Sequence, residues 1–155
     1  MITRGVLGTA LLVALLLLLS GCATNKMTRA ELEQAYDQFI VTEKLEASDT
    51  ITAFRFDGWS ELGTKHLIID TGVNRSYLVT LRNNCFNLDY AMGIKIHNMG
   101  SQLRAKFDAI SVPDEFSVKC YIQNLYKITK DQKKALWALD DPKPKDEQES
   151  KEQAS

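Results

Sequence analysis

The 155-residue chain is poor in the side chains from which metal and catalytic sites are usually built. It has two histidines and three cysteines, and none stands in a Cys-x-x-Cys or His-x-x-x-His spacing, so no metal site is predicted. It has no basic block and a formal net charge of only −1, which argues against nucleic acid as a partner. No internal repeat or linker divides it. We therefore expect one domain, with no cofactor and no nucleophile–base pair recognisable in the sequence, and we expect it not to be an enzyme.

What the chain does have is a long apolar run at its N-terminus. One basic residue, Arg4, precedes the run, which continues to residue 19. This is the length of a secretory signal peptide, and it falls short of the ~20 residues that a helix needs to cross a bilayer. The Leu-Ser-Gly-Cys sequence that follows, at positions 19–22, resembles the bacterial lipoprotein box.

That resemblance implies cleavage between Gly21 and Cys22, and attachment of lipid to the Cys22 thiol. Several acyl chains make such an anchor effectively permanent. Ala23 stands where an Asp would, by analogy, retain the protein in the inner membrane, so we expect the periplasmic face of the outer membrane. Residues 1–21 are predicted to be the signal peptide and residues 22–27 a lipidated tether, with no cofactor besides the covalent lipid.

The remainder is predicted to be one folded domain, residues 28–139, followed by a charged tail that cannot bury enough apolar surface to become ordered. Thr28 and Glu31 form a capping box before an amphipathic stripe, which predicts a helix. The expected segments are a helix at 29–44, a β core at 51–128, a short helix at 130–139 and the tail at 140–155.

Short β-branched and aromatic segments separated by turn residues fill the β core. We predict a strand at 51–56 ended by a turn at Asp57-Gly58, and a single strand over 103–109 in which Phe107 points inward and Asp108 is an outward residue or a loop anchor. Phe86 is also expected inside. The fold class is α+β, mainly β: a small antiparallel β-barrel or sandwich, with one helix before it and one after.

Once Cys22 is assigned to lipid, Cys85 and Cys120 remain as an even pair in an oxidising compartment, which favours a disulfide. It would close a loop of 36 residues (120 − 85 + 1), worth about 4 kcal/mol in the chain-entropy model. The alternatives are a metal site with His66 and His97, or a catalytic thiolate.

Three further residues are candidates for a surface or binding role. His66 shares a strand face with Asp70, but ~13 Å of extended strand would separate them, so a partly exposed histidine is expected. Trp59 is either a binding aromatic or, more typically, a core residue. Arg82 is one of several scattered cations that could approach anionic lipid headgroups if they shared a face.

Three segments together resemble a family of small proteobacterial lipoproteins that is catalogued as a domain of unknown function. The resemblance covers residues 51–128 and the lipoprotein box, and it supports the architecture and the disulfide without implying an activity. The segments are Phe54-Arg55 with Asp57-Gly58-Trp59, Tyr77-Leu78-Val79-Thr80-Leu81 leading to Cys85 and Leu88, and Phe107-Asp108 followed by Cys120-Tyr121-Ile122.

The leading functional hypothesis is a non-enzymatic envelope lipoprotein that binds another envelope protein or a glycan through its β surface. The alternative is a small barrel whose interior holds an apolar ligand or a lipid, and a filled interior would separate the two. A periplasmic hydrolase is the third hypothesis, and it requires His66 or His97 to meet an Asp and a Ser in space.

Overall fold

The structure is a computed structural model, and it describes residues 27–113 and 118–140. The predicted signal peptide, the cleavage site at Gly21, Cys22 and the tether up to residue 26 lie outside the described residues. So does the predicted tail from residue 141 onward.

The described residues form two α-helices, a 3-10 helix and nine strands. The helices are α2 (Arg29–Thr42), α3 (Lys130–Asp140) and the 3-10 helix η1 (Leu88–Tyr90). The strands are β1 (Ala47–Ser48), β2 (Thr50–Thr52), β3 (Gly58–Glu61), β4 (His66–Asp70), β5 (Ser76–Leu81), β6 (Lys95–His97), β7 (Gln102–Arg104), β8 (Ala109–Ser111) and β9 (Cys120–Ile128).

Both helices begin where the sequence predicts, because each has a capping box. The Thr28 hydroxyl accepts a hydrogen bond from the Glu31 N–H at 3.3 Å, and the Glu31 carboxylate accepts one from the Thr28 N–H at 2.7 Å. Thr129 and Gln132 make the same reciprocal pair at α3. Helix α2 ends two residues earlier than predicted, because Lys44 adopts a left-handed φ of 50°.

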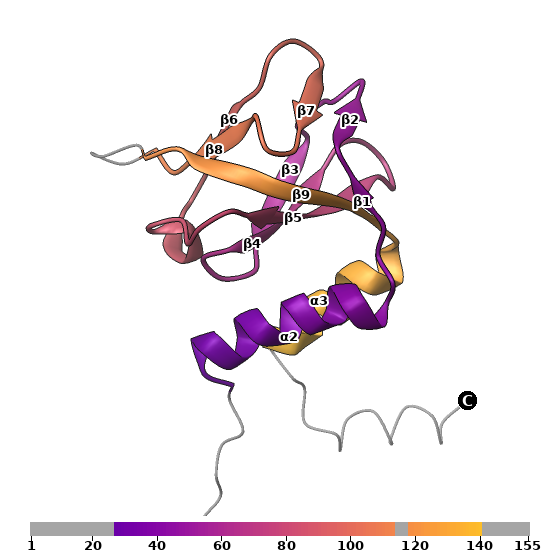
Figure 1. Ribbon diagram of the computed structural model, residues 1–155, viewed down its shortest axis with the longest axis vertical. Helices are drawn as coiled ribbons and strands as arrows, with labels where there is room; N and C mark the ends of the chain where they lie inside the picture. Colours follow the sequence, from indigo (N-terminus) through magenta and orange to yellow (C-terminus); the bar gives the residue numbers. More distant parts are fainter. Residues whose placement is uncertain (1–26, 114–117, 141–155) are drawn as a thin grey trace, which may run out of the picture.

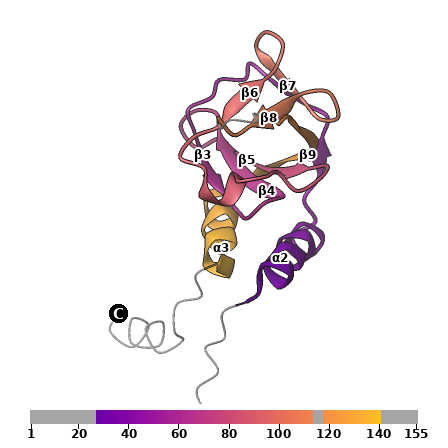
Figure 2. The ribbon, with the colours of Figure 1, turned by 90° about the vertical axis from the view of Figure 1, so that its left-hand side faces the viewer.

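Seven strands form one antiparallel sheet in the order β3-β4-β5-β9-β8-β6, with β1 also paired to β9, while β2 and β7 form a separate pair. The large sheet curls into a half-barrel around its own interior, and both helices lie side by side on its outside (Figures 1 and 2). The predicted class, mainly β with one helix before and one after, is confirmed.

Alternation along β4 and β5 separates two apolar cores. One face of these strands lines the interior of the curled sheet, and the other face packs against the helices. The interior core includes Leu67, Ile69, Val79, Leu81, Leu103, Ile110, Ile122 and Leu125, and the helix-side core includes Leu32, Tyr36, Ile68, Leu78 and Leu136. The sheet is therefore buried on both faces where the helices cover it.

The predicted strand at 51–56 and the turn after it are wrong. Strand β2 ends at Thr52, where Ala53 adopts a φ of 49°, and Gly58 begins β3, which pairs with β4. These residues have a high strand propensity, but the chain leaves the two-stranded sheet after β2 and enters the large sheet at β3. The pairing of β2 with β7 and of β3 with β4 therefore decides where each strand begins and ends.

The predicted single strand at 103–109 is also wrong. It is divided into β7 and β8 by a turn in which Lys106 adopts a φ of 70°. Asp108 is buried and accepts a hydrogen bond from the Arg104 N–H at 2.7 Å, so it anchors this turn rather than pointing outward. The period-2 pattern continues through this turn in the sequence, so the pattern alone does not reveal that the Asp108 side chain divides the strand.

Two aromatic residues expected in the interior are on the surface. The exposed fraction is 72% for Phe107 and 66% for Phe86. Phe107 lies in the turn between β7 and β8, and Phe86 follows the end of β5, so neither belongs to the alternation of a strand. Leu, Ile and Val side chains fill the interior instead.

Candidate functional site

A concentrated group of polar side chains lies where helix α2 covers the sheet. His66 begins β4 and is completely buried, and its ring lies between two carboxylates of α2. Its Nδ1 is 2.6 Å from Glu33 Oε2, and its Nε2 is 3.0 Å from Asp37 Oδ1. Both nitrogens donate to these carboxylates only when the ring is protonated. The prediction of a partly exposed His66 is wrong, because α2 covers this end of the strand.

Glu33 connects this histidine to the loop before β4. Its Oε1 accepts hydrogen bonds from the N–H groups of Thr64 and Lys65 at 2.9 and 3.1 Å. Gly63, at a φ of 90°, makes the approach possible, because a Cβ there would lie 2.7 Å from Glu33 Oε1. Burial acts to raise the pKa of Glu33, but the hydrogen bonds from His66 and Thr64 outweigh it, so the pKa is lowered. Glu33 is therefore a fixed, ionised carboxylate.

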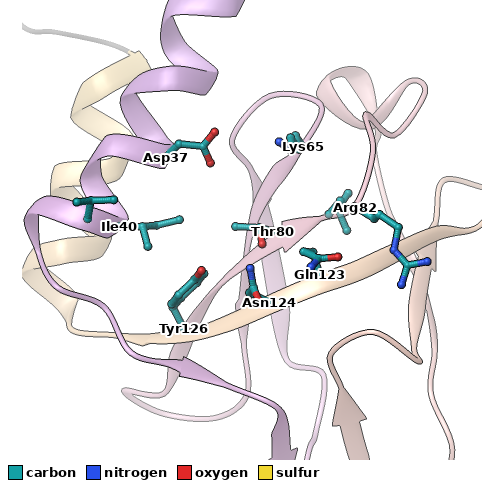
Figure 3. A pocket seen from close by; sticks show the side chains of 10 residues that line it. Asp37, Ile40, Lys65, Thr80, Arg82, Gln123, Asn124 and Tyr126 are labelled. Atoms are coloured by element: carbon teal, nitrogen blue, oxygen red, sulfur yellow. The ribbon is translucent and has the colours of Figure 1, made fainter.

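The second carboxylate, Asp37, borders an open groove of about 360 Å³ between α2 and the β5–β9 strands (Figure 3). Its side chain is 56% exposed, so one oxygen contacts His66 while the group still faces solvent. The lining residues are Asp37, Ile40, Val41, Lys65, Thr80, Leu81, Arg82, Gln123, Asn124 and Tyr126. The groove thus combines hydrogen-bonding groups with an apolar side from the end of α2.

A β-bulge forms the floor of this groove. Thr80 pairs with Asn124, and the next residue, Leu81, pairs with Ile122, which leaves Gln123 as an extra residue on β9. In a regular strand successive side chains point to opposite faces. Here Gln123 and Asn124 both line the groove, as a bulge permits by redirecting a side chain.

The polar groups on the helix side of the groove influence one another. Burial, and then the negative charge of Asp37, raise the pKa of Tyr126, while its hydrogen bond with Asn124 opposes the shift. The Tyr126 phenol is therefore neutral at physiological pH and can act as a hydrogen-bond donor or acceptor. Asp37, Tyr126 and Asn124 form a continuous polar edge from the helix to the bulge.

Neither histidine completes the set that a serine hydrolase requires within the described ranges. His66 contacts Glu33 and Asp37, but no serine is bonded to it. His97 Nε2 lies 2.9 Å from Ser111 Oγ, but within 27–113 and 118–140 its ring makes no hydrogen bond or ion pair with a carboxylate. His66 is also fully buried, so its ring cannot reach a substrate in the groove. Over the same ranges, no group of three or more His, Cys, Asp or Glu side chains could hold a metal ion.

The three predicted binding residues do not converge on one site. Trp59 is half-buried on β3 and packs against the interior core, whereas His66 faces the helices on the other side of the sheet. Arg82 is exposed at the end of β5, with its guanidinium 5.6 Å from the centre of the Tyr121 ring. Arg82 borders the groove, His66 supports it from behind, and Trp59 has no part in it.

Cys85 and Cys120 form a disulfide, with their Cα atoms 5.6 Å apart. It joins the loop after β5 to the first residue of β9. The metal-site and thiolate alternatives for these two cysteines are therefore overturned, because both sulfurs are in the bond. The predicted lipidation of Cys22 remains a prediction.

Glu33 and Asp37 are not among the site residues predicted from the sequence. The sequence places both on the polar face of α2, which is expected to face solvent. Their i, i+4 spacing, which places both on one side of the helix beside Tyr36, was the available signal. It did not reveal that the opposing residue would be His66, 29 positions or more away in sequence. Asp70, the partner considered for His66, instead accepts two hydrogen bonds from Lys133 of α3, both at 2.8 Å.

No helix within the described ranges is long and apolar enough to cross a membrane. Comparison with curated proteins found no match, and comparison with solved structures found none. A family model described as a family of unknown function, DUF6491, matches residues 6–141. The match spans most of the chain, including both cysteines of the disulfide, the groove and the two helices, and it extends into the N-terminal apolar run. The chain therefore belongs to the DUF6491 family of proteins of unknown function.

Proposed function

We propose that the protein is a lipid-anchored protein of the bacterial envelope that acts as a non-enzymatic binding module, and that the groove between α2 and β5–β9 is its binding site. The observation that carries this proposal is the β-bulge, which places the amides of Gln123 and Asn124 on the same groove. Amides donate and accept hydrogen bonds. The ligand that suits such a surface is a chain rich in hydroxyl or amide groups, that is, a glycan or a peptide segment of another envelope protein.

The groove is held in a fixed shape, which supports a binding role. Asp37 is oriented by the buried His66, and His66 is oriented in turn by Glu33. Polar groups that are already ordered lose less conformational entropy when a ligand binds. Asp37 is therefore a preorganised acceptor at the helix edge of the groove.

The packed interior favours this module over a barrel that holds an apolar ligand. Large side chains at the centre of the half-barrel, such as Leu67, Ile69, Leu81 and Ile122, have no exposed surface. A lipid or apolar ligand inside the sheet would have to displace several of them, and each is worth about 1.5–3 kcal/mol of burial.

The lipid anchor is supported by the lipoprotein box that ends at Cys22. Anchoring at the periplasmic face of the outer membrane would raise the local concentration of the module near envelope components, so that a weak interface would suffice. The anchor is tested by the mass of the amino-terminal peptide. An acylated Cys22 at the N-terminus is expected, and an unmodified Cys22 preceded by Gly21 would contradict the proposal.

The groove is tested by photocrosslinking in living cells. A benzoylphenylalanine in place of Gln123 should give a discrete crosslinked product, and mass spectrometry of that product distinguishes a glycan from a protein. The same amino acid in place of Val73, which is 88% exposed in the turn between β4 and β5, serves as the control position and should not give that product.

A second pair of variants links the crosslink to the groove chemistry. Asn124→Ala should weaken the Gln123 product, whereas Lys127→Ala, at an exposed position of the same strand, should leave it unchanged. Equal products from both crosslinking positions, or no effect of Asn124→Ala, would exclude the groove as the binding site.

A further inference from the structure

A short segment after β5 presents three large apolar side chains to solvent. The exposed fractions are 66% for Phe86, 75% for Tyr90 and 104% for Met92. Between them Leu88 is completely buried and holds η1 against the interior core. Single exposed apolar residues are ordinary, but several within seven residues indicate an interaction surface. This segment, residues 86–92, is called the apolar loop below.

The surroundings of the apolar loop add more apolar surface and positive charge. Phe86 lines a small cavity of about 190 Å³ together with the exposed Val118 and Tyr121 and with two cations, Arg82 and Lys119. Aromatic rings beside Lys and Arg side chains are the composition found where proteins meet the lipid headgroup region.

The apolar loop contacts the start of α2, which is the part of the folded domain nearest in sequence to the predicted anchor. Arg29, in the first turn of α2, forms an ion pair with Asp89 and donates a hydrogen bond to Tyr90 Oη at 3.0 Å. Figure 1 shows η1 on the same side of the molecule as the start of α2. The Arg29 contact also balances the one acidic charge of the loop, so no unpaired carboxylate opposes contact with lipid.

The length of the tether then limits where this surface can be. Five residues separate Cys22 from the folded chain at Thr28, and they reach at most ~18 Å when fully extended. A lipid on Cys22 would therefore hold the start of α2, and the apolar loop bonded to it, close to the bilayer surface.

We propose that the apolar loop is a second membrane contact, in which Phe86, Tyr90 and Met92 enter the interfacial region of the bilayer while Arg82 and Lys119 face anionic headgroups. This inference rests on the proposed lipid anchor at Cys22. It fixes the orientation of the domain: the apolar loop faces lipid, and Arg82, which also lines the groove beside α2, lies between the membrane contact and the groove.

Site-directed spin labelling of the mature lipidated protein in phosphatidylethanolamine–phosphatidylglycerol vesicles tests the proposal. Met92→Cys supplies the label position, since Cys22 carries lipid and Cys85 and Cys120 are paired. Val73→Cys is the matched control. Val73 is also highly exposed, but it lies before the start of β5, whereas the apolar loop follows the end of that strand. Near-complete exposure of both positions means that neither substitution removes packing.

Collision with oxygen, which partitions into lipid, is compared with collision with a water-soluble nickel chelate. We expect the label at position 92 to lose accessibility to nickel several-fold and to gain accessibility to oxygen on reconstitution, while the label at position 73 changes little. Equal nickel accessibility at both positions in vesicle-bound, acylated protein would overturn the membrane contact and leave the anchor standing. Protein that neither carries acyl chains nor floats with vesicles would overturn the anchor and the membrane contact together.

Discussion

Replacing Glu33 with Ala tests whether the carboxylate–histidine pair holds α2 on the sheet. The substitution removes the acceptor of the Thr64 and Lys65 backbone N–H groups and of His66 Nδ1. His66 has no exposed surface, so it cannot replace the lost partner with water. It would keep Asp37 as its remaining carboxylate.

The expected loss in the free energy of unfolding is about 3 kcal/mol at pH 7. Glu33 accepts hydrogen bonds from Thr64, Lys65 and His66, and each hydrogen bond to a charged group contributes ~1.5–3 kcal/mol. The Glu33 side chain is 18% exposed, so water can replace it at part of the Thr64–Lys65 loop, and the buried His66 hydrogen bond accounts for most of the expected loss. The loss is large against the ~5–15 kcal/mol that stabilises a typical domain.

Urea unfolding followed by far-UV circular dichroism measures this loss. Gln34→Ala is the matched control, because Gln34 is exposed on the same helix and Gln and Glu have similar helix propensities. The control should change the stability by less than ~0.5 kcal/mol. A Glu33→Ala variant as stable as the control would refute the reasoning that the pair stabilises the fold.

The pH dependence gives an independent check on the same pair. Because hydrogen bonds lower the folded-state pKa of Glu33 below its ordinary 4.5, its contribution is fully present above about pH 4.5 and is lost as the pH falls through the lowered value. The difference in stability between the wild type and Glu33→Ala should therefore shrink between pH 7 and pH 3. A difference that grows toward pH 3 would show that the assigned sign is wrong.

Three further measurements address other parts of the structure. Reduction of the disulfide, or Cys85→Ser with Cys120→Ser, should lower the free energy of unfolding by about 4 kcal/mol, the chain-entropy value for a loop of this length; an unchanged urea midpoint would contradict it. Lys133→Ala should cost about 1–2 kcal/mol, since a partly buried Lys makes two hydrogen bonds to a carboxylate, and a cost near zero would mean that α3 is held by apolar packing alone. In an NMR titration, His97 should titrate below its ordinary pKa of 6.5, because burial and then the charge of Lys119 lower that pKa; Lys119→Gln should move it upward, and no movement would exclude that charge as a cause.

The sequence alone determined the features that depend on neighbouring residues. The capping box at Thr28 located the start of α2, because a cap is satisfied within one helical turn. Short β-branched and apolar segments between turn residues located β4 and β5, but they did not show that the helices would bury the second face of these strands. The pairing of Cys85 with Cys120 followed from counting, once Cys22 was assigned to lipid.

The tertiary structure decided everything that depends on which segments meet. Asp108 fits the period-2 pattern of the sequence, but in the structure its side chain anchors a turn. This turn divides the segment into β7 and β8. His66 has two carboxylate partners because α2 packs across the start of β4. The bulge at Gln123 depends on the register between β5 and β9, and no local pattern encodes that register. Local preferences therefore specified the elements, whereas the groove and its supporting charges arose from contacts between residues far apart in the chain.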